Sequence, residues 1–165
     1  MRIELSREGA NISVTEVMPS SINTQFFEKA RTRLTVKPRP APPVYQPQLV
    51  ADAILYAAEH PTREIVVGGT GKTLIASHAL APRLTERMLS FIASSGQRTD
   101  EPKSEDAPDN LYRTLEGFDH VEGNFRAEAR ETSVYTWLAM HPTVRSLIAG
   151  TALVIAAMTV RRSFK

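Results

Sequence analysis

Two short segments rich in β-branched residues limit what this chain can fold into. Residues 12–18 read Ile-Ser-Val-Thr-Glu-Val-Met, and residues 64–68 form an apolar run that ends in glycine. The first alternates in part between apolar and polar residues, and the second is typical of a buried strand in a parallel sheet. Two strands are too few to form a stable sheet by themselves. The fold therefore depends on which other elements of the chain pack against these two segments.

Helical patterns alternate with these strands. Helices are predicted at 24–30, 48–59, 73–80 and 82–93. Thr24 is the expected N-cap of the first, and Pro47 suits the first turn of the second. Residues 36–47 contain five prolines and are expected to form a stiff, extended loop with no regular element. This alternation of strands and helices predicts an α/β fold.

The composition is that of an ordinary soluble protein, and it excludes several kinds of site. Of the 165 residues, 42% are hydrophobic and 23% charged, and the net charge of +2 predicts no nucleic-acid partner. The chain has no cysteine, which excludes disulfides, thiolate nucleophiles and cysteine-ligated metals. Its four histidines never fall at metal-ligand spacing, so no metal site is predicted. A reducing, cytoplasmic location is compatible with this composition and is the expected one.

The run Val-Val-Gly-Gly-Thr-Gly-Lys-Thr at 66–73 resembles a phosphate-binding loop between a strand and a helix. That motif requires a glycine five positions before Gly71, where this chain has Val66. No strand ending in a magnesium-binding aspartate is evident either. An ordinary strand-to-helix turn is therefore favoured over a nucleoside triphosphate site.

The chain divides into three zones. Residues 1–93 carry the α/β pattern, and residues 94–132 are polar and turn-rich, as in a flexible linker. Residues 133–165 are helical and include the uncharged stretch 146–160, which follows Arg145. This stretch is shorter than the roughly 20 apolar residues that cross a bilayer, although an arginine can snorkel and extend such a span. Membrane association and a helix packed on protein both stay open.

The segment from Gly9 to Thr24 resembles the later part of the short-chain dehydrogenase/reductase family. A helix ends at Gly9, a strand follows, and Pro19-Ser20-Ser21-Ile22-Asn23-Thr24 stands where that family has Pro-Gly-x-Val/Ile-x-Thr after its sixth strand. The proline-rich loop, the next helix and the strand at 64–68 are similar to the family's substrate loop, following helix and seventh strand. The resemblance covers residues 1–93. It implies the C-terminal portion of a doubly wound, Rossmann-type parallel sheet.

The same resemblance implies a cofactor-binding role for four residues. Pro19 and Ser20 would shape the turn beside the nicotinamide, with Ser20 replacing the family's usual glycine. Backbone groups of Ile22 would bind the carboxamide, and the Thr24 hydroxyl would bind the carboxamide or a phosphate oxygen. A turn at the C-terminal edge of a parallel sheet is where such folds bind ligands. An ordinary strand-ending turn is the alternative.

Other parts of the family's machinery are missing from this sequence. There is no Thr-Gly-x-x-x-Gly-x-Gly turn, and no tyrosine has a lysine four positions later, so no catalytic residue is assigned. The resemblance implies hydride transfer between NAD or NADP and an alcohol or carbonyl substrate. The chain is expected to be an N-terminally truncated fragment that binds the cofactor poorly and is inactive alone. The alternative is a non-catalytic interaction protein or membrane-tethered protein that reuses the half-fold.

The resemblance also implies that the strands at 12–18 and 64–68 are neighbours in the sheet. In the complete family fold the first of them also pairs with an earlier strand, which this sequence does not contain. Its outer edge would then be open, and an open apolar edge invites self-association.

Overall fold

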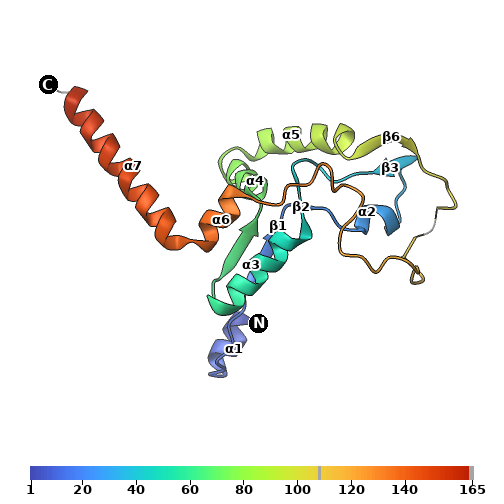
Figure 1. Ribbon diagram of the computed structural model, residues 1–165, viewed down its shortest axis with the longest axis horizontal. Helices are drawn as coiled ribbons and strands as arrows, with labels where there is room; N and C mark the ends of the chain where they lie inside the picture. The colour runs from blue at the N-terminus through green and yellow to red at the C-terminus, as the bar shows by residue number, and fades with distance from the viewer. Residues whose placement is uncertain (108, 164–165) are drawn as a thin grey trace.

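The computed structural model describes residues 1–107 and 109–163 (Figure 1). The elements are α1 (Arg2–Arg7), β1 (Glu16–Pro19), β2 (Ser21–Ile22), α2 (Phe26–Lys29), β3 (Val36–Pro38), β4 (Val44–Tyr45), α3 (Pro47–Glu59), β5 (Glu64–Val67), α4 (Gly69–Leu80), α5 (Pro82–Ser95), β6 (Arg98–Pro102), α6 (Val134–Met140) and α7 (Pro142–Ser163). The architecture is α/β, with the short parallel strand pairs β1–β5 and β2–β4, the antiparallel pair β3–β6, flanking helices and a long apolar helix near the C-terminus. The doubly wound arrangement of a larger sheet stays a prediction.

The parallel pair β1–β5 is the centre of the fold. Val17 is opposite Ile65 and Met18 is opposite Val66, so the predicted neighbours are indeed adjacent and parallel. Helix α3 lies along this pair (Figure 1) and buries Leu49, one turn before Ala53. Because residues four apart share one helix face, this stripe packs on the buried side chains of β5. The resulting core also contains Tyr45, Ile65 and Val67.

Strand β1 is shorter than the predicted 12–18. It pairs only over Glu16–Pro19, because β5 offers four residues to pair with. The carbonyl of Val14 instead accepts a hydrogen bond of 2.9 Å from the Arg2 side chain. Within the described residues β1 pairs with β5 alone, so association through its other edge stays a prediction.

The proline-rich loop also departs from its prediction. It contains β3 and β4, which pair with β6 and β2 respectively. The reason for β4 is local, since Val44 and Tyr45 follow the prolines and keep the backbone N–H groups that a ladder requires. Strand β6 lies in the polar zone 94–132, which was expected to be a flexible linker. Flexibility of that zone and the boundary at residue 93 stay predictions.

Two predicted helix starts were wrong. Helix α4 begins at Gly69, four residues before the predicted Thr73, because a side chain distant in sequence caps it. Helix α2 is a single turn whose N-cap is Gln25 and not Thr24. The helix ends agree better with the sequence: His60 and His141, each before a proline, end α3 and α6.

Gly9 ends α1 as predicted. Its φ of 67° is in the left-handed region, which glycine adopts at little cost. Its N–H donates to the Ser6 carbonyl at 3.4 Å and the Ala10 N–H donates to the Leu5 carbonyl at 3.0 Å. This pair of bonds is a Schellman motif, which satisfies carbonyls at a helix C-terminus.

Candidate functional site: the turn after β1 and the cavity beside α2

The turn at Pro19–Thr24 lies where two parallel strand pairs end. Pro19 is the last residue of β1 and is opposite Val67, whose carbonyl accepts a hydrogen bond of 2.8 Å from the Ser20 N–H. Ile22 is the last residue of β2 and is opposite Tyr45. Ligands of open α/β sheets bind at this C-terminal edge. The four predicted cofactor residues therefore lie in one turn at this edge of the two strand pairs.

The Ser20 hydroxyl links the β1 turn to the start of α4. Its Oγ donates to the Gly68 carbonyl at 3.2 Å and accepts from the Gly71 N–H at 3.1 Å. This hydroxyl therefore caps the N-terminus of α4 from a distant part of the chain. A Cβ on Gly71 would lie 2.9 Å from this Oγ, and one on Gly68 would lie 2.5 Å from it. At Gly68 the φ of 94° and the nearby Ser20 and Tyr45 side chains favour glycine, and at Gly71 a side chain would have to displace the Ser20 hydroxyl.

The same contacts occupy two backbone N–H groups of the 66–73 run. A phosphate would need the free backbone N–H groups at the start of α4. The Gly71 N–H is already bonded to Ser20, and the Gly68 N–H donates to the Thr136 Oγ1 at 2.9 Å in a buried position. These amides bind the protein's own hydroxyls, which agrees with the favoured strand-to-helix turn.

Asn23 holds the turn in place, and sequence analysis did not single it out. It is fully buried, and its Nδ2 donates to the Gln46 Oε1 at 3.2 Å. Its Oδ1 accepts from the Phe125 N–H at 3.0 Å, and its carbonyl accepts from the Gly123 N–H at 3.1 Å. A buried amide satisfied on both its oxygen and its nitrogen fixes the backbone around it. No sequence signal links position 23 to residues a hundred positions later.

Residues 122–136, here called the crossing segment, pass over the ends of the strands. Beyond its contacts with Asn23, the Arg130 N–H donates to the Val44 carbonyl at 2.9 Å and the Arg130 carbonyl accepts from the Gln46 N–H at 3.0 Å. Thr136 then reaches Gly68. The crossing segment therefore joins the β1 turn, β4 and the end of β5. Part of it belongs to the zone that sequence analysis assigned to a linker.

Thr24 is the predicted site residue whose side-chain hydroxyl is available to bind a ligand. Its N–H donates to the Ile22 carbonyl at 3.0 Å, which closes a tight turn. The side chain is half-buried, and its hydroxyl makes no hydrogen bond with any residue in the described ranges. A Cβ on Gly123 would lie 2.4 Å from the Thr24 carbonyl, so the crossing segment presses against this residue's backbone. Thr24 combines a fixed backbone with an available hydroxyl.

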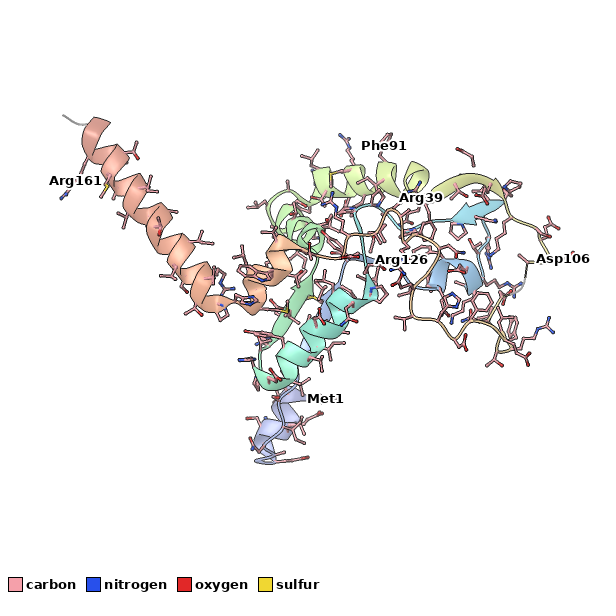
Figure 2. All side chains as sticks on the ribbon, in the orientation of Figure 1. Met1, Arg39, Phe91, Asp106, Arg126 and Arg161 are labelled. Carbon is pink, nitrogen blue, oxygen red and sulfur yellow. The ribbon has the colours of Figure 1, made fainter. Side chains whose placement is uncertain are left out.

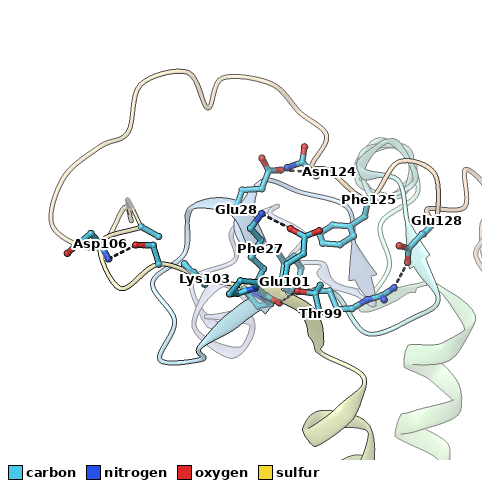
Figure 3. A pocket seen from close by; sticks show the side chains of 15 residues that line it. Phe27, Glu28, Thr99, Glu101, Lys103, Asp106, Asn124, Phe125 and Glu128 are labelled. Carbon is cyan, nitrogen blue, oxygen red and sulfur yellow. Dashed lines mark hydrogen bonds and ion pairs between the residues drawn. The ribbon is translucent and has the colours of Figure 1, made fainter.

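An open cavity of about 970 Å³ lies beside α2, the helix that follows Thr24 in the chain (Figure 3). Phe27 and Glu28 of α2 line one side, and Lys37, Pro38 and Arg39 come from the proline-rich loop. The other walls are formed by part of 99–107 and by the crossing segment. The rings of Phe27 and Phe125 meet edge to face with centroids 6.0 Å apart. The loop predicted to border the substrate does line this cavity.

Charged side chains on the cavity wall are mostly paired. The Lys37 Nζ lies 2.7 Å from a carboxylate oxygen of Glu101, and this hydrogen bond and positive charge lower the pKa of the Glu101 carboxyl. Arg39 pairs with Glu128, yet its Nε is buried with no hydrogen-bond partner in the described chain. A cavity with aromatic and proline surfaces and charged side chains on its wall suits a small organic molecule with a polar end.

One curated relative matches nearly the whole chain. The protein named Uncharacterized oxidoreductase YxnA, from Bacillus subtilis (strain 168), is 34% identical over 158 residues. The match covers 95% of this chain and 44% of the relative, so the chain spans less than half of that protein's length. No protein-family model matches the chain. No solved structure matches it.

Proposed function

We propose that this chain forms the nicotinamide-side part of an NAD(P)-dependent oxidoreductase of the short-chain dehydrogenase/reductase type. The observation that carries the proposal is the Pro19–Thr24 turn, which lies at the C-terminal edge of β1 and leads into α2. Phe27 and Glu28 of α2 line a cavity together with the proline-rich loop. The name of the Bacillus relative supports an oxidoreductase. The reaction class is hydride transfer between the cofactor and an alcohol or carbonyl compound.

The residues present fit the nicotinamide end of the cofactor. Thr24 offers a half-buried hydroxyl that is not used within the described chain, as a carboxamide or phosphate oxygen would require. Asn23 and the crossing segment fix the backbone on which that hydroxyl stands. Ser20 and Pro19 hold the start of the turn against β5. Preorganised groups of this kind lower the cost of binding.

A nicotinamide cofactor, when bound, would supply the hydride chemistry, and the residues of this chain would contribute positioning. Thr24 would orient the carboxamide, and the cavity beside α2 would hold the substrate. The sequence contains neither the Gly-rich pyrophosphate turn nor Tyr-x-x-x-Lys. We therefore expect the 165-residue chain by itself to bind NAD(P)H weakly and to reduce no carbonyl compound at an enzyme-like rate.

The test is a hybrid in which this chain replaces the matched 158 residues of the Bacillus relative. Nicotinamide cofactor binding is measured by calorimetry, so that no substrate needs to be known. Thr24→Val should weaken cofactor binding about 5-fold, the loss of one hydrogen bond of about 1 kcal/mol. Thr24→Ser keeps the hydroxyl and should bind like the unmodified hybrid.

Two results would contradict the proposal. Equal cofactor affinity of the Thr24→Val and unmodified hybrids would show that this hydroxyl does not bind the cofactor. A folded hybrid that binds neither NADH nor NADPH would favour the non-catalytic alternative.

A further inference from the structure

Helix α7 is long, apolar and unpacked. Its stretch Pro142–Arg161 has 20 residues with a mean hydropathy of 1.7, and none of it is buried against the rest of the chain. The helix extends away from the other elements (Figure 1), and its side chains stand in open space (Figure 2). Soluble domains rarely expose so large a contiguous apolar surface. Something outside the described chain is expected to cover it.

The dimensions of α7 match a lipid bilayer. At a rise of about 1.5 Å per residue, the 20 residues of Pro142–Arg161, which include Arg145 and Arg161, extend about 30 Å, the hydrocarbon thickness of a typical bilayer. The uncharged stretch 146–160 lies between Arg145 and Arg161, whose long side chains can reach the headgroups at either end. The helix sequence contains no acidic residue.

The distribution of apolar side chains favours a helix that crosses the bilayer over one that docks on protein. Leu153, Val154 and Ile155 are consecutive and all more than half exposed, so apolar side chains point in every direction around the axis. A helix that lies flat on a membrane, or packs on a protein, has one apolar stripe and an opposite polar face. Helix α5 is of that kind, with exposed Leu84 and Met88 one turn apart.

Two threonine hydroxyls within the uncharged stretch of α7 are satisfied by the helix itself. Thr151 Oγ1 donates to the Leu147 carbonyl at 2.9 Å, and Thr159 Oγ1 donates to the Ile155 carbonyl at 2.6 Å. A polar group that bonds its own helix can enter hydrocarbon without an unpaired donor. Trp137, in the helix before α7, is 47% exposed, as expected of a residue at the membrane–water interface.

We infer that α7 crosses a lipid bilayer as a single span. The span would hold the candidate site near the membrane surface, because α6 connects the two. Thr136 of α6 is hydrogen-bonded to Gly68 at the end of β5, and α7 begins at Pro142. This inference does not depend on the proposed function, since it rests on α7 alone.

The first test compares matched charge substitutions in the full chain, expressed in bacteria and fractionated after carbonate washing. Leu153→Lys puts a charge near the centre of α7 and should lower the ratio of inserted to free protein on the order of 100-fold. Leu84→Lys makes the same change on α5, where Leu84 is 69% exposed, and should stay in the membrane fraction. Equal fractionation of the two variants would overturn the inference. Circular dichroism of both variants controls for folding.

The second test distinguishes a span from a helix that lies flat or docks on protein. The chain has no cysteine, so single cysteines can be introduced as Val134→Cys, or added after Lys165. A membrane-impermeant maleimide should label only one of the two in intact spheroplasts and both after permeabilisation. Labelling of both, or of neither, in intact spheroplasts would show that the two ends share one side and would overturn the span.

Discussion

Helices α3 and α7 are both rich in apolar residues, but one face of α3 is buried whereas the apolar stretch of α7 is exposed. Helix α3 buries Leu49, Ala53 and Ala57 on one face against β1 and β5. Helix α7 has no residue of its apolar stretch buried against the chain. The difference teaches that apolar content alone does not place a helix in a protein core. What matters is whether the apolar side chains gather on one face that another element can cover.

The largest effect on stability is expected when the same substitution, valine to alanine, is made in the buried core and on the exposed helix α7. Val67 is fully buried in β5, whereas Val154 of α7 is 53% exposed. Val67→Ala should lower the free energy of unfolding by about 2.5 kcal/mol, from lost burial plus the cavity that is left. Val154→Ala should change it by less than about 0.5 kcal/mol. Urea unfolding in one mild detergent measures both, and equal losses would erase the contrast between core and α7.

A second, smaller effect should separate a buried hydroxyl from an exposed one. Thr136 is fully buried and accepts from the Gly68 N–H, whereas the Thr151 hydroxyl serves only its own helix. Thr136→Val keeps the shape but leaves a buried N–H unpaired, which should cost about 1.5 kcal/mol of unfolding free energy. Thr151→Val should be nearly neutral in the same denaturation experiment. A neutral Thr136→Val would mean that α6 is not held to β5 by this bond.

The smallest effect is expected at the exposed pair on the cavity wall. Lys37 lowers the pKa of Glu101, so this pair stabilises the fold above the ordinary pKa of a glutamate, and the contribution is lost as pH falls through the lowered value. Lys37→Met should raise the Glu101 pKa toward its ordinary value. The change in stability should be small because both side chains are exposed. Carboxyl NMR titration checks the pKa; an unchanged value would show that the pair does not persist in solution.

Local signals predicted the elements whose causes are local. Proline after His60 and His141 ends α3 and α6, and Gly9 ends α1, because each residue restricts or permits backbone angles by itself. The apolar runs indicated the two strands β1 and β5, whereas the family resemblance implied that they are adjacent and parallel, which the register confirms. In the candidate site, the sequence placed Pro19, Ser20, Ile22 and Thr24 in one turn after a strand. Whether these four bind a cofactor stays a prediction.

Contacts between distant residues decided the rest. Helix α4 begins at Gly69 because the Ser20 hydroxyl caps it, a bond that spans 51 positions. The crossing segment is polar and turn-rich, yet its backbone pairs with Asn23, Val44 and Gln46. Such hydrogen bonds depend on which distant segments the fold brings into contact, and a local sequence pattern does not predict those contacts. The sequence by itself determined the turns, the helix ends and the all-round apolar character of α7, since these follow from each residue's own geometry and solubility. Only the tertiary structure decided what caps α4, what closes over the β1 turn, and that α7 finds no partner within the described chain, because each depends on surfaces brought together by folding.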